Sequence, residues 1–326
     1  MNRRRIHGGT GVAAVLIAAG LLVPAGATAA PARPDVTSGP AANVAQSTAT
    51  LTGSVNPNEV ETRYFFEYGT TRTYGTRVPN PPASVGNGNR RVAVTADIAG
   101  LAPATTYHYR IVARNARGVR RGADRTFRTQ RQPLGLSLTA TSNPVLPGGE
   151  TAIVGTLSGT GNADRQVRLQ ANPFPYTQGF QNASDVHLTN ADGSFTFPIL
   201  SLSINTQYRV VLPNVPAVQS PIVAVGVAPS VSVKVKRVRR TARGAIFRFT
   251  GTVSPPHDGT QIAIQRLKDN GWVTITGTIA KHRSSSASRY RKAVRLRRGG
   301  TFRVFAGTND GDHVPNVSRS VRLRVR

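Results

Sequence analysis

The feature that most constrains the fold of this chain is a recurrence of short apolar runs with a period of two residues. Clusters of Gly, Pro, Asn and Asp separate these runs, and beyond the N-terminal segment the sequence has no sustained 3.6-residue period. A period of two is typical of half-buried β-strands, and the separating residues are typical of turns. The pattern therefore predicts an all-β chain made of antiparallel sandwiches.

The length of the chain sets the expected number of sandwiches. The first 29 of its 326 residues read as a removable segment, and the rest suffices for three sandwiches of about 100 residues each. We predict three tandem immunoglobulin-like or fibronectin III-like β-sandwiches after a signal peptide. The expected division is a signal peptide over 1–29, a flexible leader over 30–34, and sandwiches over 35–130, 133–228 and 229–326.

The N-terminal segment has the parts of a secretory signal. Arg3-Arg4-Arg5 is a positive region, residues 11–23 form an apolar run that is short for a membrane span, and Ala27-Thr28-Ala29 has the small residues of a cleavage site. The absence of cysteine excludes disulfides, thiolate metal sites and a lipid-anchor cysteine. We expect a secreted, extracellular protein, either released or held at the cell wall without a covalent link. An uncleaved N-terminal anchor is the alternative.

Residues 35–130 carry the most informative motifs. Leu101, a Pro-containing turn and then Tyr107 at the start of an alternating strand form the pattern of a tyrosine corner, in which the tyrosine ring is buried and its hydroxyl bonds to upstream backbone. With Thr50 to Pro57, Phe66 to Thr70 and Asp124 to Thr129, this stretch resembles a fibronectin type III domain of the variety found in exported actinobacterial proteins. The chain lacks the Arg-Gly-Asp tripeptide in the corresponding loop, so the resemblance does not imply integrin binding.

The other two thirds resemble bacterial immunoglobulin-like modules. Gly-Thr-Leu and Gly-Thr-Val strands occur at Gly155 and Gly251, and strands of the form apolar-x-apolar-Gln begin at Val167 and Ile262. These repeated strands suggest that residues 133–228 and 229–326 are divergent copies of one unit.

Positive charge is concentrated in the last third of the chain. Residues 229–326 contain 22 basic and 4 acidic residues, whereas residues 133–228 contain 3 basic and 4 acidic ones. A domain with such an excess attracts polyanions. Because most of the basic residues are arginine, Arg-rich coding alone is a competing explanation.

Candidate binding residues lie on strands in which basic and apolar residues alternate. Alternate side chains of a strand point to opposite faces, so the arginines at odd positions of 289–297 oppose the apolar residues at even positions. Residues 231–236 and 321–325 repeat the pattern. We predict one patch that binds anionic cell-wall or extracellular polymers, formed by Lys234, Lys236, Arg289, Arg291, Arg295, Arg297, Arg322 and Arg324. The alternative is a solvated surface that protects sheet edges.

A second hypothesis is an accessory carbohydrate-binding protein that supports a glycan-degrading enzyme. The loop at 173–180 holds Phe174, Tyr176 and Phe180, which would stack on sugar rings, and Trp272 is the single tryptophan. The competing interpretation is that Phe174 and Phe180 fill the core and Trp272 packs on a sheet.

Enzymatic, metal and nucleic-acid functions find little support in the sequence. There is no nucleophile elbow, phosphate loop or metalloprotease motif, so we expect neither catalysis nor a cofactor. The segments 190–193 and 309–313 resemble fragments of a calcium loop without the distal Glu, and turn chemistry explains both. The six histidines show no pair at ligand spacing, so no metal site is predicted. Few aromatics interleave with the basic residues, which disfavours dedicated nucleic-acid binding.

Overall fold

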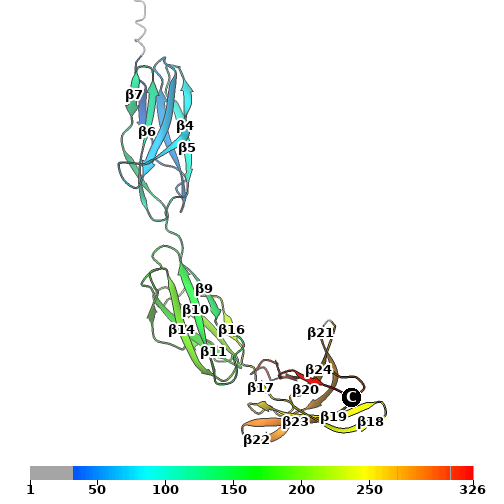
Figure 1. Cartoon of the computed structure of the whole chain (residues 1–326). Coiled ribbons are helices and arrows are strands. Elements are labelled where there is room, and N and C mark those ends of the chain that lie inside the picture. Colours follow the sequence, from blue (N-terminus) through cyan, green and yellow to red (C-terminus); the bar gives the residue numbers. More distant parts are fainter. Residues whose placement is uncertain (1–31, 270, 309, 326) are drawn as a thin grey trace, which may run out of the picture. The chain divides into compact units, whose positions relative to one another are not determined.

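The computed structural model describes residues 32–269, 271–308 and 310–325, so the expected signal peptide lies outside the described residues. Within these ranges every regular element is a β-strand, and all strands pair antiparallel in six sheets. The prediction of an all-β fold is confirmed. No helix in the described ranges is long and apolar enough to cross a membrane. Figure 1 draws these strands as arrows. The described residues divide into two compact units, the first made of 32–100 with Thr106–Arg128 and the second of Leu101–Thr105 with 129–325.

The first unit contains two sheets with the strand orders β1-β2-β5 and β4-β3-β6-β7, and β8 also pairs with β6. Its strands are β1 Asp35–Ser38, β2 Thr48–Asn56, β3 Thr62–Gly69, β4 Thr76–Gly86, β5 Val92–Ala99, β6 Thr106–Asn115, β7 Gly118–Arg121 and β8 Arg125–Arg128.

The core of the first unit lies between these two sheets. Leu51 of β2 and Phe66 and Ile111 of β3 and β6 are fully buried. Gly53 lies where the sheets approach each other, since a Cβ there would be 2.9 Å from Ile111 Cδ1 and 3.3 Å from the Phe66 ring. Alternation of apolar residues on both sheets thus produces the sandwich that the resemblance to fibronectin type III domains implies.

The second pair of sheets has the orders β14-β10-β9 and β12-β11-β15-β16, with β13 also paired to β11. Ile153 and Phe197 from the first of these sheets share one apolar core with Leu169, Val210 and Val225 from the other. The strands are β9 Gly135–Ala140, β10 Gly149–Ser158, β11 Gln166–Pro173, β12 Gln181–Asn182, β13 His187–Leu188, β14 Ser194–Leu202, β15 Thr206–Val211 and β16 Val223–Val225.

The third pair of sheets has the orders β17-β19-β23-β22, where β18 also pairs with β19, and β21-β20-β24-β25, where β26 also pairs with β24. Phe249 and Tyr290 of one sheet pack with Ile264 and Phe302 of the other in a single core. The strands are β17 Ser230–Val231, β18 Lys234–Thr241, β19 Gly244–Ser254, β20 Gln261–Lys268, β21 Gly271–Ile279, β22 Lys281–Ser284, β23 Ala287–Leu296, β24 Gly300–Gly307, β25 Asn316–Val317 and β26 Val321–Leu323.

The three sheet pairs are called here the first, second and third sandwich. The second and third belong to one compact unit. The exact boundaries at 130–133 and 228–229 stay predictions.

Candidate functional site

The alternation predicted for residues 289–297 is present in strand β23. Tyr290 and Leu296 are buried in the third core, whereas Arg289, Arg291 and Arg295 are exposed. This division follows from the period of two, since the strand has one face against the core and the other in water. Arg297 is exposed and lies one residue beyond the end of the strand.

Strand register brings the lysines of β18 onto the same sheet as these arginines. Lys234 lies opposite Thr250 of β19, and Thr250 lies opposite Arg291 of β23. Lys236 is likewise opposite Arg248, two residues further along the strand and on the same face. Side chains directly opposite one another on adjacent antiparallel strands share a face. Lys234, Lys236 and the arginines of β23 are therefore brought together.

Arg322 and Arg324 do not join this patch. Strand β26 pairs with β24, which belongs to the opposite sheet of the sandwich. The contact between the two sheets here is at an edge, where the Arg237 guanidinium donates to the Arg324 carbonyl at 2.8 Å. The prediction of one patch from three strands is wrong for this strand, because the period of two fixes the face of a strand and not the sheet that the strand joins.

Four further basic residues lie on the same face and were not predicted. Arg239 and Arg248 come from β18 and β19, and Lys281 and Arg283 come from the short strand β22, which pairs Lys281 with Arg289. The alternation Lys281-His282-Arg283 is the sequence signal that would have found two of them. We call the resulting surface the cationic face: Lys234, Lys236, Arg239, Arg248, Lys281, Arg283, Arg289, Arg291 and Arg295.

Part of the cationic face is hollowed into an open groove of about 810 Å³. Five of its basic residues line the groove together with hydroxyl groups that can donate hydrogen bonds. The lining includes Ser232, Lys234, Thr250, Thr252, Lys281, Arg283, Arg289 and Arg291.

No carboxylate occurs on strands β18, β19, β22 or β23. Among the residues that the structure describes, the cationic face forms no salt bridge. Asp258, in the loop after β19, accepts a hydrogen bond from Ser288 of β23 and lies 3.3 Å from His282 Nδ1 of β22. The positive field of this face is thus not neutralised by its own strands.

A buried tyrosine fixes the sheet behind the groove. The Tyr290 hydroxyl donates a hydrogen bond to the Ser232 carbonyl at 2.6 Å. Burial raises the pKa of Tyr290 well above its ordinary value, so the phenol stays protonated and keeps donating. The contact holds the segment before β18 against β23.

Of the two residues of the predicted tyrosine corner, Tyr107 lies in β6 of the first sandwich, and Leu101 lies in the segment before that strand. Leu101 and Tyr107 are buried, and the Tyr107 ring stacks on Phe127 at 5.6 Å between centroids. The bond of the Tyr107 hydroxyl to upstream backbone stays a prediction. Tyr109, two residues later, donates from its hydroxyl to the Gly39 carbonyl at 2.6 Å.

The aromatic residues of the carbohydrate hypothesis do not form an open platform. The Arg209 guanidinium lies over the Phe180 ring at 4.3 Å, and the Arg303 guanidinium lies over Trp272 at 4.4 Å. The Phe174 and Tyr176 rings meet edge to face. All four rings are half-buried.

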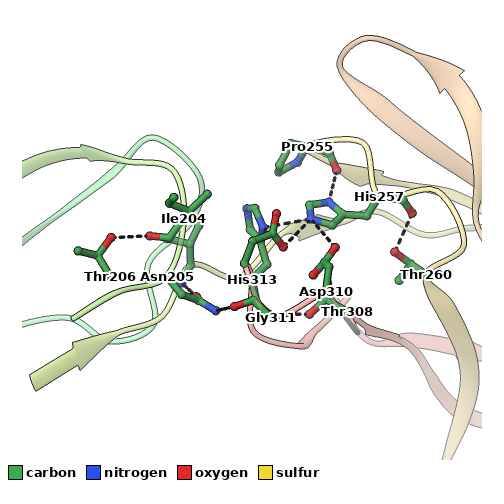
Figure 2. A network of polar contacts seen from close by, with 12 residues as sticks. Ile204, Asn205, Thr206, Pro255, His257, Thr260, Thr308, Asp310, Gly311 and His313 are labelled. Carbon is green, nitrogen blue, oxygen red and sulfur yellow. Dashed lines mark hydrogen bonds and ion pairs between the residues drawn. The ribbon is translucent and has the colours of Figure 1, made fainter. Parts of the chain in front are cut away.

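The structure also brings together two histidines that the sequence analysis treated as unrelated. His257 and His313 lie in different loops of the third sandwich, with His257 Nε2 3.0 Å from His313 Nδ1. Asp312 joins them, so that three potential metal-ligating atoms lie within 4.8 Å of one another. Figure 2 shows the two histidine side chains. No two histidines stand at ligand spacing in the sequence, and spacing could not reveal this contact because it joins separate loops 56 residues apart.

No protein-family model matches this chain, and no curated protein matches it. Similar solved structures include the FN1-FN3 domains of chicken CNTN1, with 15% identity, coverage of 90% of this chain and 99% of that chain, and a TM-score of 0.29. A run of domains from titin shows 16% identity, covers 89% and 99% of the two chains, and has a TM-score of 0.38. A tandem repeat from the extending region of a large adhesion protein shows 12% identity, covers 90% and 74%, and has a TM-score of 0.30. These values are too low to transfer a function.

Proposed function

We propose that this chain is a secreted, non-enzymatic binding or spacer protein whose third sandwich binds anionic polymers of the cell envelope through the cationic face. The observation that carries the proposal is the arrangement of nine lysine and arginine side chains on one sheet whose strands β18, β19, β22 and β23 contain no carboxylate.

The chemistry of the face suits phosphate and carboxylate groups. Arginine presents a planar fork of N–H donors that binds such groups in a bidentate manner. Along a strand, residues on one face repeat at about 6.6–6.8 Å, so Arg289 and Arg291 can contact successive anionic groups of an extended polymer. The second sandwich carries 3 basic and 4 acidic residues and offers no comparable field.

The test uses the chain from residue 30 to 326 and isolated anionic cell-wall polymer. Binding driven by displaced counterions should weaken steeply between roughly 50 and 200 mM salt. Replacing Arg289, Arg291, Arg295 and Lys234 by Ser should lower the slope of log affinity against log salt by about 0.7–0.9 for each contact removed. Isothermal titration calorimetry at several salt concentrations measures both quantities.

A matched control removes the same number of positive charges from another part of the chain. Replacing the exposed Arg114, Arg117, Arg120 and Arg121 of the first sandwich by Ser also removes four positive charges and should leave the slope nearly unchanged. Equal weakening by both quadruple variants would mean that only total charge matters. Salt-insensitive binding that is lost on truncation of Phe174, Tyr176 or Phe180 would instead support the carbohydrate hypothesis.

A further inference from the structure

His257, Asp312 and His313 place three potential metal-ligating atoms within 4.8 Å of one another. Figure 2 shows that His257 and His313 come from two loops of the third sandwich, with Asp310 beside them. His257 Nε2 lies 3.0 Å from His313 Nδ1, 3.4 Å from Asp312 Oδ1 and 3.5 Å from Asp310 Oδ2. His313 Nδ1 lies 2.9 Å from the same Asp312 oxygen. His257 follows β19 and the other three residues follow β24, so the cluster exists only in the folded sandwich.

The separations among His257, Asp312 and His313 agree with three ligand positions of a tetrahedral site for a small divalent cation. Zinc binds imidazole nitrogen at about 2.0–2.1 Å and carboxylate oxygen at about 2.0–2.2 Å, which places the ligand atoms of a tetrahedron about 3.3–3.6 Å apart. The observed separations of 2.9–3.4 Å lie at or slightly below this range. A cation entering the cluster would therefore need only small side-chain adjustments.

The surroundings of His257 orient it as a ligand. Its Nδ1 is 3.0 Å from the Pro255 carbonyl, and donation of a hydrogen bond there leaves the lone pair of Nε2 directed at the cluster. Outer contacts of this kind are the usual way in which proteins fix the tautomer of a metal-binding histidine. The Thr260 hydroxyl donates to the His257 carbonyl at 2.7 Å and holds the loop itself.

The ring of His313 is directed by the cluster as well. Its side chain is 2% exposed, and in the described part of the chain its Nε2 has no hydrogen-bond partner. Nδ1 is thus the atom through which this buried ring makes its polar contacts. Burying the imidazole with its Nε2 unpaired costs free energy, unless Nδ1 makes a strong interaction that offsets this cost.

The two carboxylates complete the cluster on its solvent side. Asp312 and Asp310 have side chains that are 30% and 47% exposed, which leaves a path for an ion to enter.

We infer that His257 Nε2, His313 Nδ1 and Asp312, with Asp310 beside them, form a binding site for a divalent transition metal ion of the zinc type. Two imidazole nitrogens favour zinc and related ions over calcium and magnesium, which prefer oxygen ligands. The alternative is that hydrogen bonds alone hold the cluster, with Asp310-Gly311 serving only as a turn.

An ion at this position would hold the loop that contacts the second sandwich. Asn205, in the turn before β15, donates from its amide side chain to the Gly311 carbonyl and from its backbone to the Asp312 carbonyl, both at 2.8 Å. Val314 N–H donates to the Val227 carbonyl at 2.8 Å. Ligation by Asp312 and His313 would therefore stabilise the segment on which these contacts depend.

The test uses the untagged chain from residue 30 to 326 after removal of metal with a chelator. We expect one Zn²⁺ per chain after dialysis, measured by elemental analysis, and a thermal midpoint that rises with Zn²⁺ and returns with EDTA. Co²⁺ should give the visible absorption of a tetrahedral nitrogen and oxygen site. His257→Gln and Asp312→Asn should each lower Zn²⁺ affinity at least about 10–100-fold.

The same sandwich contains a matched control. His282 and Asp258 form a second histidine–carboxylate pair, with 70% and 49% exposed side chains. His282→Gln should bind Zn²⁺ as the unmodified chain does. Asp312 is partly exposed, so Asp312→Asn tests the site if His257→Gln fails to fold, as judged by circular dichroism. The inference is overturned if the unmodified chain retains no Zn²⁺, if it prefers Ca²⁺, or if Asp312→Asn binds as tightly as His282→Gln.

Discussion

Charged residues of the first sandwich and of the cationic face differ in whether an opposite charge lies beside them. In the first sandwich Glu67 accepts from the Arg110 guanidinium at 2.9 Å and lies 3.4 Å from Arg77. Asp124 lies 2.8 Å from His108 Nδ1 and 3.3 Å from Arg72. In such pairs the opposite charges neutralise each other within the fold, whereas the charges of the cationic face are not paired with carboxylates.

Asp124 provides a pH test of these pairs. Partial burial raises its pKa, but hydrogen bonds from His108 and from the Tyr74 hydroxyl outweigh this and leave the pKa below its ordinary value. A lowered folded-state pKa means that the carboxylate stabilises the fold above about pH 3.9, the unfolded value, and that this contribution is lost as the pH falls through the folded value.

Asp124→Asn should therefore lower the free energy of unfolding at pH 7 by about 1 kcal/mol. The difference from the unmodified chain should shrink as the pH falls below about 4. Urea unfolding at pH 7 and at pH 3 measures this difference in the free energy of unfolding. Asp97→Asn is the control for the loss of one exposed carboxylate, on β5. A difference that is the same at both pH values would contradict the assignment.

The strands show how far a pattern of period two can predict a fold. The alternating residues 48–55 and 289–297 form β2 and most of β23 with the expected faces. The pattern could not predict that β18 and β26 join opposite sheets, because pairing depends on partners elsewhere in the chain. The His257–His313 contact was missed for a similar reason, since 56 residues separate the two.

Corresponding strands of the second and third sandwiches carry the same contacts. Arg209 Nε donates to Gln170 Oε1, and Arg303 Nε donates to Gln265 Oε1, each at 2.8 Å. A Cβ at Gly155 would lie 2.3 Å from the Ser137 carbonyl oxygen of β9. A Cβ at Gly251 would lie 1.9 Å from the carbonyl oxygen of Ser232, which follows β17. The repeated sequence motifs thus occupy equivalent places, which supports the interpretation that the two sandwiches are divergent copies.

Tyr290 tests how the first strands of the third sandwich are held. Tyr290→Phe removes the donor to the Ser232 carbonyl and should cost about 1–2 kcal/mol of unfolding free energy, because the carbonyl loses its partner. Hydrogen exchange should show faster exchange at Val231. Tyr176→Phe, at a half-exposed tyrosine outside the cores, is the control. Equal stability of both variants would show that the bond contributes nothing.

At the scale of the whole chain, the two expected boundaries differ in their surroundings. Residues 130–133 are exposed. Val227 and Ala228 are buried at 0% and 3% exposure, and Val227 N–H donates to Asn205 Oδ1 at 2.7 Å. Composition alone predicts that a protease would cleave both segments, because each is short and lies between strand-rich regions. The burial of the second segment changes that expectation.

Limited proteolysis of residues 30–326 with a protease of broad specificity should therefore cleave first within 130–133 and leave a fragment that spans 226–229. Asn205→Ala removes the side-chain bonds to Val227 N–H and to the Gly311 carbonyl, and should make 226–229 susceptible under the same conditions. Mass spectrometry of the fragments identifies the cleavage sites. Cleavage of the unmodified chain at 226–229 as fast as at 130–133 would show that Asn205 does not protect this segment and that the second and third sandwiches open independently.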